Sequence, residues 1–230
     1  MTASSYDRYL QTLGIERWLL RRPQAQTAVA AVIPAPASVS LRDSTGMNWE
    51  ELAGCVAGCS KCSLHGGRTQ TVFGVGNRTA EWMIIGEAPG AEEDARGEPF
   101  VGRAGQLLNA MLQAIGLQRQ QVYIANILKC RPPNNRDPQP EEVEQCRPYL
   151  RRQIELVAPR VILAVGRIAA QNLLLTEETI GRLRGRIHRH AESGVPVVAT
   201  YHPAYLLRKP GDKRKAWQDL QLARQALQQA

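Results

Sequence analysis

Four cysteines fall into two pairs whose types and spacing suit an iron or zinc site. Cys59 and Cys62 form a C-x-x-C pair, and Cys130 and Cys146 form a second pair separated by fifteen residues. The second pair is too widely spaced for a zinc ribbon, which repeats C-x-x-C. Uneven spacing favours a 4Fe–4S cluster, with zinc or unconnected thiols as the alternatives. Cys55, four residues before Cys59, is either a free thiol or a substitute ligand.

The stretch from Trp82 to Gly105 predicts a buried strand, a tight loop and a helix in succession. The loop is broken by glycine and proline and reads GEAPGAEED from Gly86 to Asp94. Open α/β sheets place their ligands at such strand ends. The loop matches neither the P-loop nor the G-x-G-x-x-G pattern, and its carboxylates would repel a phosphate. It is therefore suited to a neutral or base-like group.

Two more polar side chains follow apolar runs. Asn126 is the polar exception in VYIANILK, residues 122–129, and is either a satisfied core amide or a reader of a base edge. His202 directly precedes Pro203, which holds its backbone extended. Such a histidine is more often structural than catalytic. Here it stands at the carboxyl end of a predicted parallel strand, as Asn126 and the acidic loop do.

The elements that must position these residues alternate between apolar runs and helical patterns. This order predicts a three-layer α/β/α sandwich with a mostly parallel four-stranded sheet. The expected strands are residues 82–85, 122–129, 160–166 and 195–201. The expected helices are residues 49–57, 106–115, 141–156, 168–175 and 212–228. The basic run RLRGRIHRH, residues 182–190, is interpreted as a loop that is solvated or contacts a DNA backbone.

The formal charge of +8, from 29 Lys and Arg against 21 Asp and Glu, fits a polyanionic partner. DNA or RNA comes first and an acidic protein second, although an ordinary basic soluble protein fits the charge equally well. No apolar run approaches the roughly 18 residues of a spanning helix. Charged residues also interrupt the N-terminus, unlike a secretory signal. We therefore expect a cytoplasmic protein without a membrane partner.

The chain divides into a peptide at residues 1–23, a linker at 24–46 and an α/β domain at 47–230. The linker is rich in Ala, Val, Pro and Ser. The peptide carries more apolar surface than so short a segment can bury, so it docks on its own domain or lies in a partner's groove. The apolar residues concerned are Leu10, Leu13, Ile15, Trp18 and Leu19.

The run LQTLGIERWLLRRP, Leu10 to Pro23, resembles the N-terminal peptide of the psi subunit of the bacterial replicative DNA polymerase, DNA polymerase III. The resemblance ends at Pro23. It implies that the five apolar residues bind the collar of the clamp loader, with the chi subunit as a further partner.

The cysteines together with GEAPGAEED, PFVGRAGQLL, NILKCRPPNNRDP and HPAYLLR resemble the iron–sulfur, family 4 uracil-DNA glycosylases. The resemblance covers roughly residues 50–228. It implies hydrolysis of the N-glycosidic bond of uracil in DNA. It also implies a 4Fe–4S cluster ligated by Cys59, Cys62, Cys130 and Cys146, with Cys55 and the long N-terminal arm as departures from the family.

The same resemblance implies a role for each site residue. Phe100 stacks on the flipped uracil, Asn126 reads its edge, and His202 lies near its O2 atom. Glu87 orients the attacking water or stabilises the sugar cation, and Glu93 excludes the methyl group of thymine. The catalytic residues are then Glu87 and His202, and residues 203–208 enter the duplex. The expected substrate contacts are Gly86, Ala88, Glu93, Phe100, Asn126 and His202.

Three functions stay open at this stage. The first is an active glycosylase that its N-terminal peptide recruits to the replication machinery. The second is a non-catalytic, psi-like subunit that bridges the clamp loader and chi on a glycosylase fold. The third is a zinc-bound nucleic-acid module.

Overall fold

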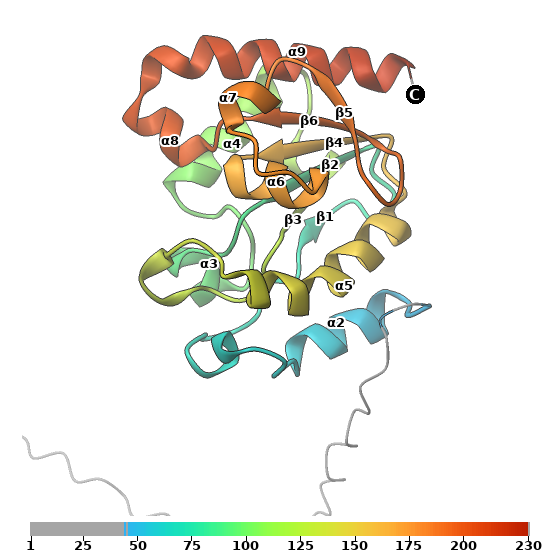
Figure 1. Cartoon of the computed structure of the whole chain (residues 1–230), viewed down its shortest axis with the longest axis vertical. Coiled ribbons are helices and arrows are strands. Elements are labelled where there is room, and N and C mark those ends of the chain that lie inside the picture. The colour runs from blue at the N-terminus through green and yellow to red at the C-terminus, as the bar shows by residue number, and fades with distance from the viewer. Residues whose placement is uncertain (1–43, 45, 230) are drawn as a thin grey trace, which may run out of the picture. The chain divides into compact units, whose positions relative to one another are not determined.

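The computed structural model describes Ser44 and residues 46–229, and the elements below belong to this part of the chain (Figure 1). The N-terminal peptide at residues 1–23 and nearly all of the expected linker lie outside the described residues. The expected α/β domain at 47–230 lies almost entirely inside them.

The core is a six-stranded sheet with the strand order β1-β3-β2-β4-β6-β5. Its four central strands run parallel and coincide with the four predicted runs: β2 (Trp82–Gly86), β3 (Tyr123–Asn126), β4 (Val161–Val165) and β6 (Pro196–Thr200). Every residue of β2, β3 and β4 is buried, as expected for parallel strands covered on both faces.

Two short antiparallel strands, absent from the prediction, complete the edges. β1 (Val75–Gly76) pairs with β3, and β5 (Ile187–Arg189) pairs with β6. β5 and the short helix α7 (Ile180–Leu183) fall in or beside the basic run that was interpreted as a loop, so that interpretation was wrong in part. Strands of two or three residues are too short to show an alternating pattern, and their pairing partners alone define them.

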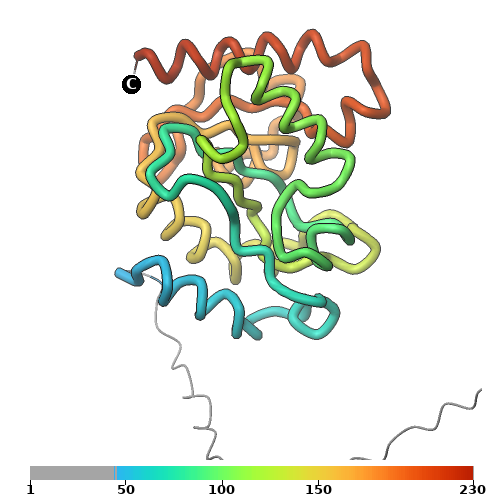
Figure 2. The backbone as a smooth tube through the Cα atoms, turned by 180° about the vertical axis from the view of Figure 1, so that it is seen from behind, coloured from blue at the N-terminus to red at the C-terminus, as the bar shows by residue number. Residues whose placement is uncertain are grey.

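Helices cover both faces of the sheet, which confirms the three-layer architecture (Figures 1 and 2). Met83 and Ile85 pack with α5 (Pro140–Val157) and α6 (Arg167–Leu174). Trp82 and Ile84 face the other way and pack with α4 (Arg103–Ala114), α8 (Pro203–Arg208) and α9 (Lys213–Gln229). The alternation along one strand thus supplies both core layers.

The remaining helices lie next to the features that could do chemistry. α2 (Trp49–Ala57) packs on α5, and the first cysteine pair lies between α2 and the 3-10 turn η1 (Ser63–Gly66). Asn48 caps α2 by accepting hydrogen bonds from the backbone N–H groups of Glu50 and Glu51. α3 (Ala91–Arg96) carries the acidic loop. Short 3-10 turns are η2 (Arg119–Gln121), η3 (Pro133–Asn135) and η4 (Pro210–Asp212).

Within the described part of the chain, no helix combines the length and the apolar character that crossing a membrane requires.

Candidate active site

A cavity of about 480 Å³ opens at the carboxyl edge of the parallel strands. Glu87 follows β2, Asn126 ends β3 and His202 follows β6, so three strand ends meet there. Because the four strands are parallel, their carboxyl ends lie along the same edge of the sheet, and ligands bind outside such an edge. The lining includes these predicted site residues: Glu87, Ala88, Glu93, Phe100, Asn126 and His202.

Gly86, the remaining predicted substrate contact, does not line the cavity but lies against two residues that do. A Cβ atom at position 86 would lie 2.5 Å from Asn126 Oδ1 and 2.6 Å from Phe100 Cζ. Both distances are far inside van der Waals contact. The absence of a side chain at Gly86 therefore lets the Asn126 amide and the Phe100 ring approach each other.

Asn126 is buried, with 2% of its surface exposed. Its Oδ1 atom is a buried side-chain acceptor that has no hydrogen-bond partner among the described residues. A buried polar group without a partner costs free energy, and natural proteins retain few of them. A ligand that donates a hydrogen bond from within the cavity would satisfy this oxygen. The reading of Asn126 as a satisfied core amide is therefore wrong.

Phe100 adopts an unusual backbone conformation in the loop between α3 and α4. Its φ of 54° lies in the left-handed region, which a residue with a Cβ rarely adopts. The ring is 7% exposed and stacks on the His202 imidazole, with centroids 5.7 Å apart and planes inclined by 30°. A flat aromatic face and an imidazole thus line the same part of the cavity.

His202 is held in one orientation and, when neutral, in one tautomer. Its Nδ1 atom accepts a hydrogen bond of 3.2 Å from the backbone N–H of Ala204, as the N-cap of α8. In the neutral ring the proton must then be on Nε2, which is left as a donor. Burial lowers the pKa of His202 to about 4; Arg208 acts in the same direction and Glu93 opposes it. The imidazole is neutral at physiological pH.

Glu87 is a half-buried carboxylate at the other side of the cavity. Burial raises its pKa to about 7, with the negative charge of Asp137 acting in the same direction and Arg167 opposing both. The Arg167 guanidinium is itself paired with Asp137 at 2.6 Å. A carboxyl group that titrates near neutral pH inside a cleft is suited to exchanging a proton with water or to holding a charge near a cation.

Glu93 uses its carboxylate to hold the backbone of the loop. Its Oε1 atom accepts hydrogen bonds from the N–H groups of Val101 and Gly102, at 3.0 and 3.2 Å. Its Oε2 atom accepts one from Gly90, at 3.1 Å. The sequence indicated a carboxylate at the cavity but gave no sign of these bonds, which fix the segment that carries Phe100.

Among the lining residues that the sequence interpretation missed, three lie in one loop: Pro132, Asn135 and Arg136. They lie in the loop RPPNNRDP that follows β3, which the sequence interpretation used for the family resemblance without assigning these residues to the site. Asn135 is in the left-handed region, with φ of 53°, and accepts a hydrogen bond from Arg131 Nε. The signal was present in the position of the loop, directly after a strand that delivers a site residue.

Residues 73–221 match the Uracil DNA glycosylase superfamily. The type-4 uracil-DNA glycosylase of Archaeoglobus fulgidus is 54% identical over 161 residues, which cover 67% of this chain and 81% of that protein. That of Pyrobaculum aerophilum is 45% identical over 180 residues, covering 76% and 92%. That of Thermotoga maritima is 43% identical over 169 residues, covering 72% and 88%. The chain belongs to the type-4 uracil-DNA glycosylase family.

Membership of this enzyme family does not favour the reading of the chain as a non-catalytic subunit. The predicted site residues of the glycosylase surround one cavity, and the relatives named above carry the name of the enzyme. The superfamily match begins at residue 73, and the comparisons give no support to the psi-like peptide. That peptide and its contacts, Leu10, Leu13, Ile15, Trp18 and Leu19, lie outside the described residues.

The four cysteines of the expected cluster line one small cavity on the α2 and α5 side of the molecule. The Sγ atom of Cys130 accepts a hydrogen bond of 3.1 Å from Arg68 Nη1. Cys55 is not in the lining. No group of three or more His, Cys, Asp or Glu side chains within the described ranges is close enough to hold a single metal ion.

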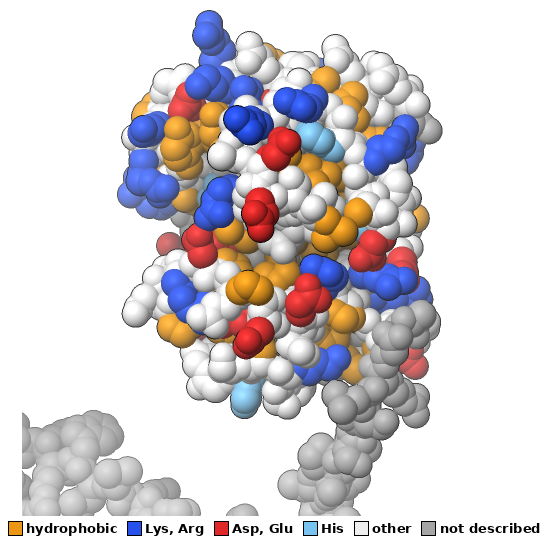
Figure 3. Space-filling view, in the orientation of Figure 1, with side chains coloured by type: hydrophobic (Ala, Val, Ile, Leu, Met, Phe, Trp, Pro, Cys, Tyr) orange, Lys and Arg blue, Asp and Glu red, His pale blue; other side chains and the backbone are white. Residues whose placement is uncertain are grey.

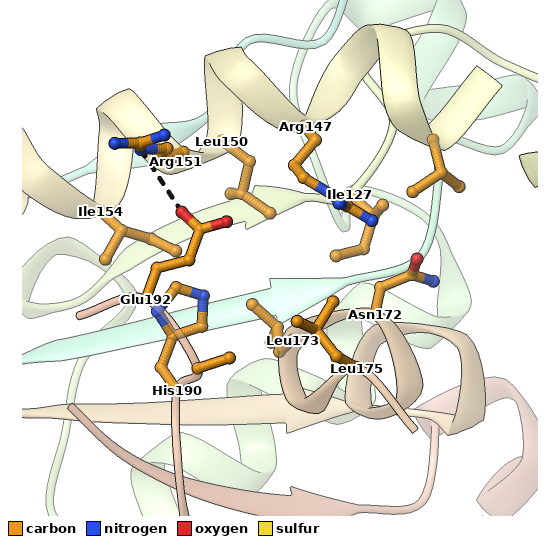
Figure 4. Close-up of a pocket in the computed structure, with 12 residues that line it drawn as sticks. Ile127, Arg147, Leu150, Arg151, Ile154, Asn172, Leu173, Leu175, His190 and Glu192 are labelled. Atoms are coloured by element: carbon orange, nitrogen blue, oxygen red, sulfur yellow. Dashed lines mark ion pairs between the residues drawn. The ribbon is translucent and has the colours of Figure 1, made fainter. Parts of the chain in front are cut away.

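A third hollow, of about 30 Å³, lies between α5, α6 and the loop after β5 (Figure 4). Apolar side chains such as Ile127 and Leu173 line it, and an ion pair of 3.3 Å between Arg151 and Glu192 lies at its edge. None of the predicted site residues of the glycosylase family reaches it. It has room for a water molecule and not for a pyrimidine.

Positive charge gathers on one part of the surface of this family member. Lys and Arg side chains cover the region of α8 and the start of α9, at the upper left of Figure 3. The sequence there reads RKPGDKRK over residues 208–215, and Arg208 also lines the active-site cavity. In the basic run, by contrast, Arg184 is not free for DNA, because it pairs with the buried Asp219 at 2.9 Å.

Proposed function

We propose that this protein hydrolyses the N-glycosidic bond of uracil in DNA, as the first step of base excision repair. The observation that carries the proposal is the unpartnered Asn126 Oδ1 atom, buried in a cavity that also holds an aromatic ring and a neutral imidazole. The N3–H group of uracil is a donor that would satisfy this oxygen. The cavity volume of about 480 Å³ also leaves room for a base with its sugar.

The base must leave the duplex to reach this cavity, and unstacking it costs a few kcal/mol. Stacking on Phe100 and hydrogen bonding to Asn126 offset part of that cost. Arg208 and the basic surface over α8 and α9 supply attraction for the phosphate backbone. The segment 203–208, which forms most of α8, is proposed to enter the duplex beside the flipped nucleotide.

Cleavage of the N1–C1′ bond places negative charge on the leaving uracil and positive charge on the sugar. We assign His202 to the uracil side, where its Nε2–H donates to O2 as the charge forms. A preoriented donor that need not reorganise during the reaction stabilises a developing anion strongly. A neutral imidazole performs this role without giving up its proton.

We assign Glu87 to the sugar side of the bond. As a carboxylate it either orients and deprotonates the attacking water or stabilises the cationic sugar through its charge. Glu87→Gln tests whether the charge or basicity of the carboxylate is needed, because the amide keeps the shape of the side chain and can still form hydrogen bonds but loses both properties. Glu93 and Ala88 are proposed to form the wall near C5 that excludes the methyl group of thymine.

The direct test is a single-turnover assay on a duplex with one uracil, beside the same duplex with thymine. We expect an alkali-labile abasic site with uracil only, and losses of roughly 100-fold or more for His202→Ala and Asn126→Ala. A folded protein that releases no uracil from single- or double-stranded DNA would rule the proposal out.

We further propose that Cys59, Cys62, Cys130 and Cys146 hold a 4Fe–4S cluster. The lining of one small cavity by all four cysteines supports a shared site, and Arg68 supplies positive charge beside Cys130. Such a cluster would tie the loop after α2 to α5 and to the segment after Asn126, with no role in hydrolysis, which transfers no electrons. A brown protein with matching iron and sulfide contents is expected, while a zinc module would be colourless.

The third part of the proposal concerns residues 1–23, which rest on their resemblance to the psi peptide alone. We propose that they tether the enzyme to the clamp loader of the replicative polymerase, and through it to chi, in the cytoplasm. A pull-down of clamp-loader subunits with the full chain and with a chain lacking residues 1–23 tests this. Equal recovery with both chains would remove the tether and leave the glycosylase proposal intact.

A further inference from the structure

Phe100, whose ring is proposed to stack on the base, has an unfavourable backbone conformation. Phe100 has φ of 54°, where a Cβ atom crowds the neighbouring carbonyl. Such conformations persist only when the surrounding groups hold them, and they cluster at functional sites. The groups that hold Phe100 are therefore part of the machinery that places its ring.

Two of these groups act from the side of α3 and α4. Glu93 accepts hydrogen bonds from the N–H groups of Val101 and Gly102, directly after Phe100. Gly105 lets the first turn of α4 approach, since a Cβ atom there would collide with the Phe100 carbonyl oxygen. These contacts hold the peptide group that follows the ring. The carbonyl groups of Pro99 and Phe100, one before the ring and one after it, have a further partner.

Arg119 holds those carbonyl groups. Its Nη2 atom donates to the Pro99 carbonyl oxygen at 2.5 Å, and its Nη1 atom makes a weaker contact of 3.4 Å with the Phe100 carbonyl oxygen. Nη1 also lies 3.4 Å from Asn109 Oδ1 on α4. One rigid guanidinium thus connects two consecutive peptide groups of the loop to the helix behind it.

The place of Arg119 separates it from the cavity. It begins the 3-10 turn η2, after α4, is half-buried and does not line the site. The negative charges of Glu98 and Glu93 favour the charged form of the Arg119 guanidinium. Its hydrogen bonds, however, go to carbonyl and amide oxygens and not to these carboxylates. Its planar fork matches two neighbouring carbonyls in a way that lysine does not.

We propose that Arg119 is a positioning residue for the base-stacking ring of Phe100. This inference rests on the proposed function for its consequence, since the ring matters through the base stacked on it. Removing the guanidinium releases the Pro99 and Phe100 carbonyls, and the Phe100 backbone relaxes toward negative φ. The ring then loses the orientation in which it stacks on His202 and on the base.

The experiment is a double-mutant cycle built from Arg119→Gln and Phe100→Ala. Each variant is assayed for single-turnover removal of uracil, and for affinity to a duplex with a 2′-fluorinated deoxyuridine that resists cleavage. We expect Arg119→Gln to lose roughly 10- to 100-fold in both readouts when Phe100 is present. In the Phe100→Ala background the same change should cost less than about twofold, because no ring is left to position.

The matched control is Arg160→Gln. Arg160 likewise donates to a backbone carbonyl, that of Leu227 at 3.0 Å, but it stands at the amino end of β4, opposite the cavity. Arg160 also forms an exposed ion pair with Glu81 at 2.8 Å. Loss of the Arg160 guanidinium should leave the uracil readouts unchanged. If Arg119→Gln is unfolded at the assay temperature, Arg119→Lys, which keeps the charge and one donor, takes its place under the same criterion.

An equal loss with and without the Phe100 ring would overturn the inference, and so would no loss with the ring present. The affinity measurement tests the role of Arg119 independently of whether the protein hydrolyses uracil. A wild-type protein that prefers the fluorinated uracil duplex but cleaves no uracil would refute hydrolysis while still deciding the role of Arg119.

Discussion

The ring of Phe100 lies on the imidazole of His202, with centroids 5.7 Å apart and planes inclined by 30°. One residue comes from the loop between α3 and α4 and the other follows the end of β6. Gly166, at the end of β4, also contacts His202, since a Cβ there would lie 3.2 Å from the His202 Cβ. The stacking surface and the donor are therefore one packed unit, and a change at either is felt at the other.

Replacing Asn126 by leucine should separate activity from stability. The unpartnered Oδ1 atom costs free energy in the folded protein, and an apolar group of similar size removes that cost. We expect a melting temperature equal to or above that of the wild type, with a loss of roughly 100-fold or more in uracil removal. A clear loss of stability in thermal denaturation would mean that the amide is satisfied in the folded core.

Gly86→Ala should damage the cavity without straining the backbone, because Gly86 does not adopt a positive φ. The added methyl group would lie 2.5 Å from Asn126 Oδ1 and push the amide and the Phe100 ring apart. We expect a loss of roughly 100-fold in single-turnover rate. The matched control is Gly54→Ala in α2, where nothing lies within 4 Å and alanine should stabilise the helix by about 0.5–1 kcal/mol.

The pH dependence of the reaction should follow Glu87. Its pKa is raised to about 7, so the carboxylate forms as the pH rises through neutrality. The single-turnover rate should rise with a midpoint near that value and level off above it. Glu87→Gln should be slow and nearly independent of pH over the same range. His202 does not contribute, since its pKa of about 4 keeps it neutral there.

The same raised pKa has a consequence for stability. Between the ordinary value of 4.5 and about 7, folded Glu87 binds more proton than unfolded Glu87, so its contribution falls as the pH rises. Glu87→Gln removes this cost. The variant should therefore match the wild type in free energy of unfolding near pH 4 and exceed it at pH 8, as measured by denaturant titration. A constant difference at both pH values would contradict the assignment.

Among the charged residues outside the cavity, Asp219 should lower the free energy of unfolding most when it is replaced. Its side chain is fully buried, and it binds Arg184 and the Thr200 hydroxyl, at 2.9 and 3.0 Å. Asp219→Ala leaves the partly buried Arg184 guanidinium without its carboxylate partner and should cost about 3 kcal/mol in denaturant unfolding. Breaking the exposed Arg78–Glu50 pair with Glu50→Ala should cost little, because solvent screens it.

Much of the site could be predicted because each of its residues stands next to a strong local pattern. The buried run before Gly86 and the run that contains Asn126 are parallel strands, whose covered faces make them almost wholly apolar. A polar residue at the end of such a run is conspicuous. The carboxyl ends of parallel strands meet, so Glu87, Asn126 and His202 could be placed together before any coordinates.

Other features depend on contacts between distant segments and leave no local trace. The edge strands β1 and β5 exist only through their partners β3 and β6. The basic run was interpreted as a loop that is solvated or contacts DNA, yet Arg184 within it pairs with an aspartate on α9. Arg119 shows no sign in the sequence of reaching Pro99, because a guanidinium on a turn looks the same whether it meets solvent or a carbonyl.

The amino-acid sequence was enough to specify four parallel strands, the shared edge at their carboxyl ends and the residue types delivered there, since hydrophobic periodicity and glycine–proline loops are local properties. The order of the strands and the atoms that are free to bind became known only from the folded structure. It left Asn126 Oδ1 without a partner, used both oxygens of Glu93 for the backbone and set the tautomer of His202. Hydrogen-bond partners and burial belong to pairs of residues brought together by folding, and a single residue type does not specify them.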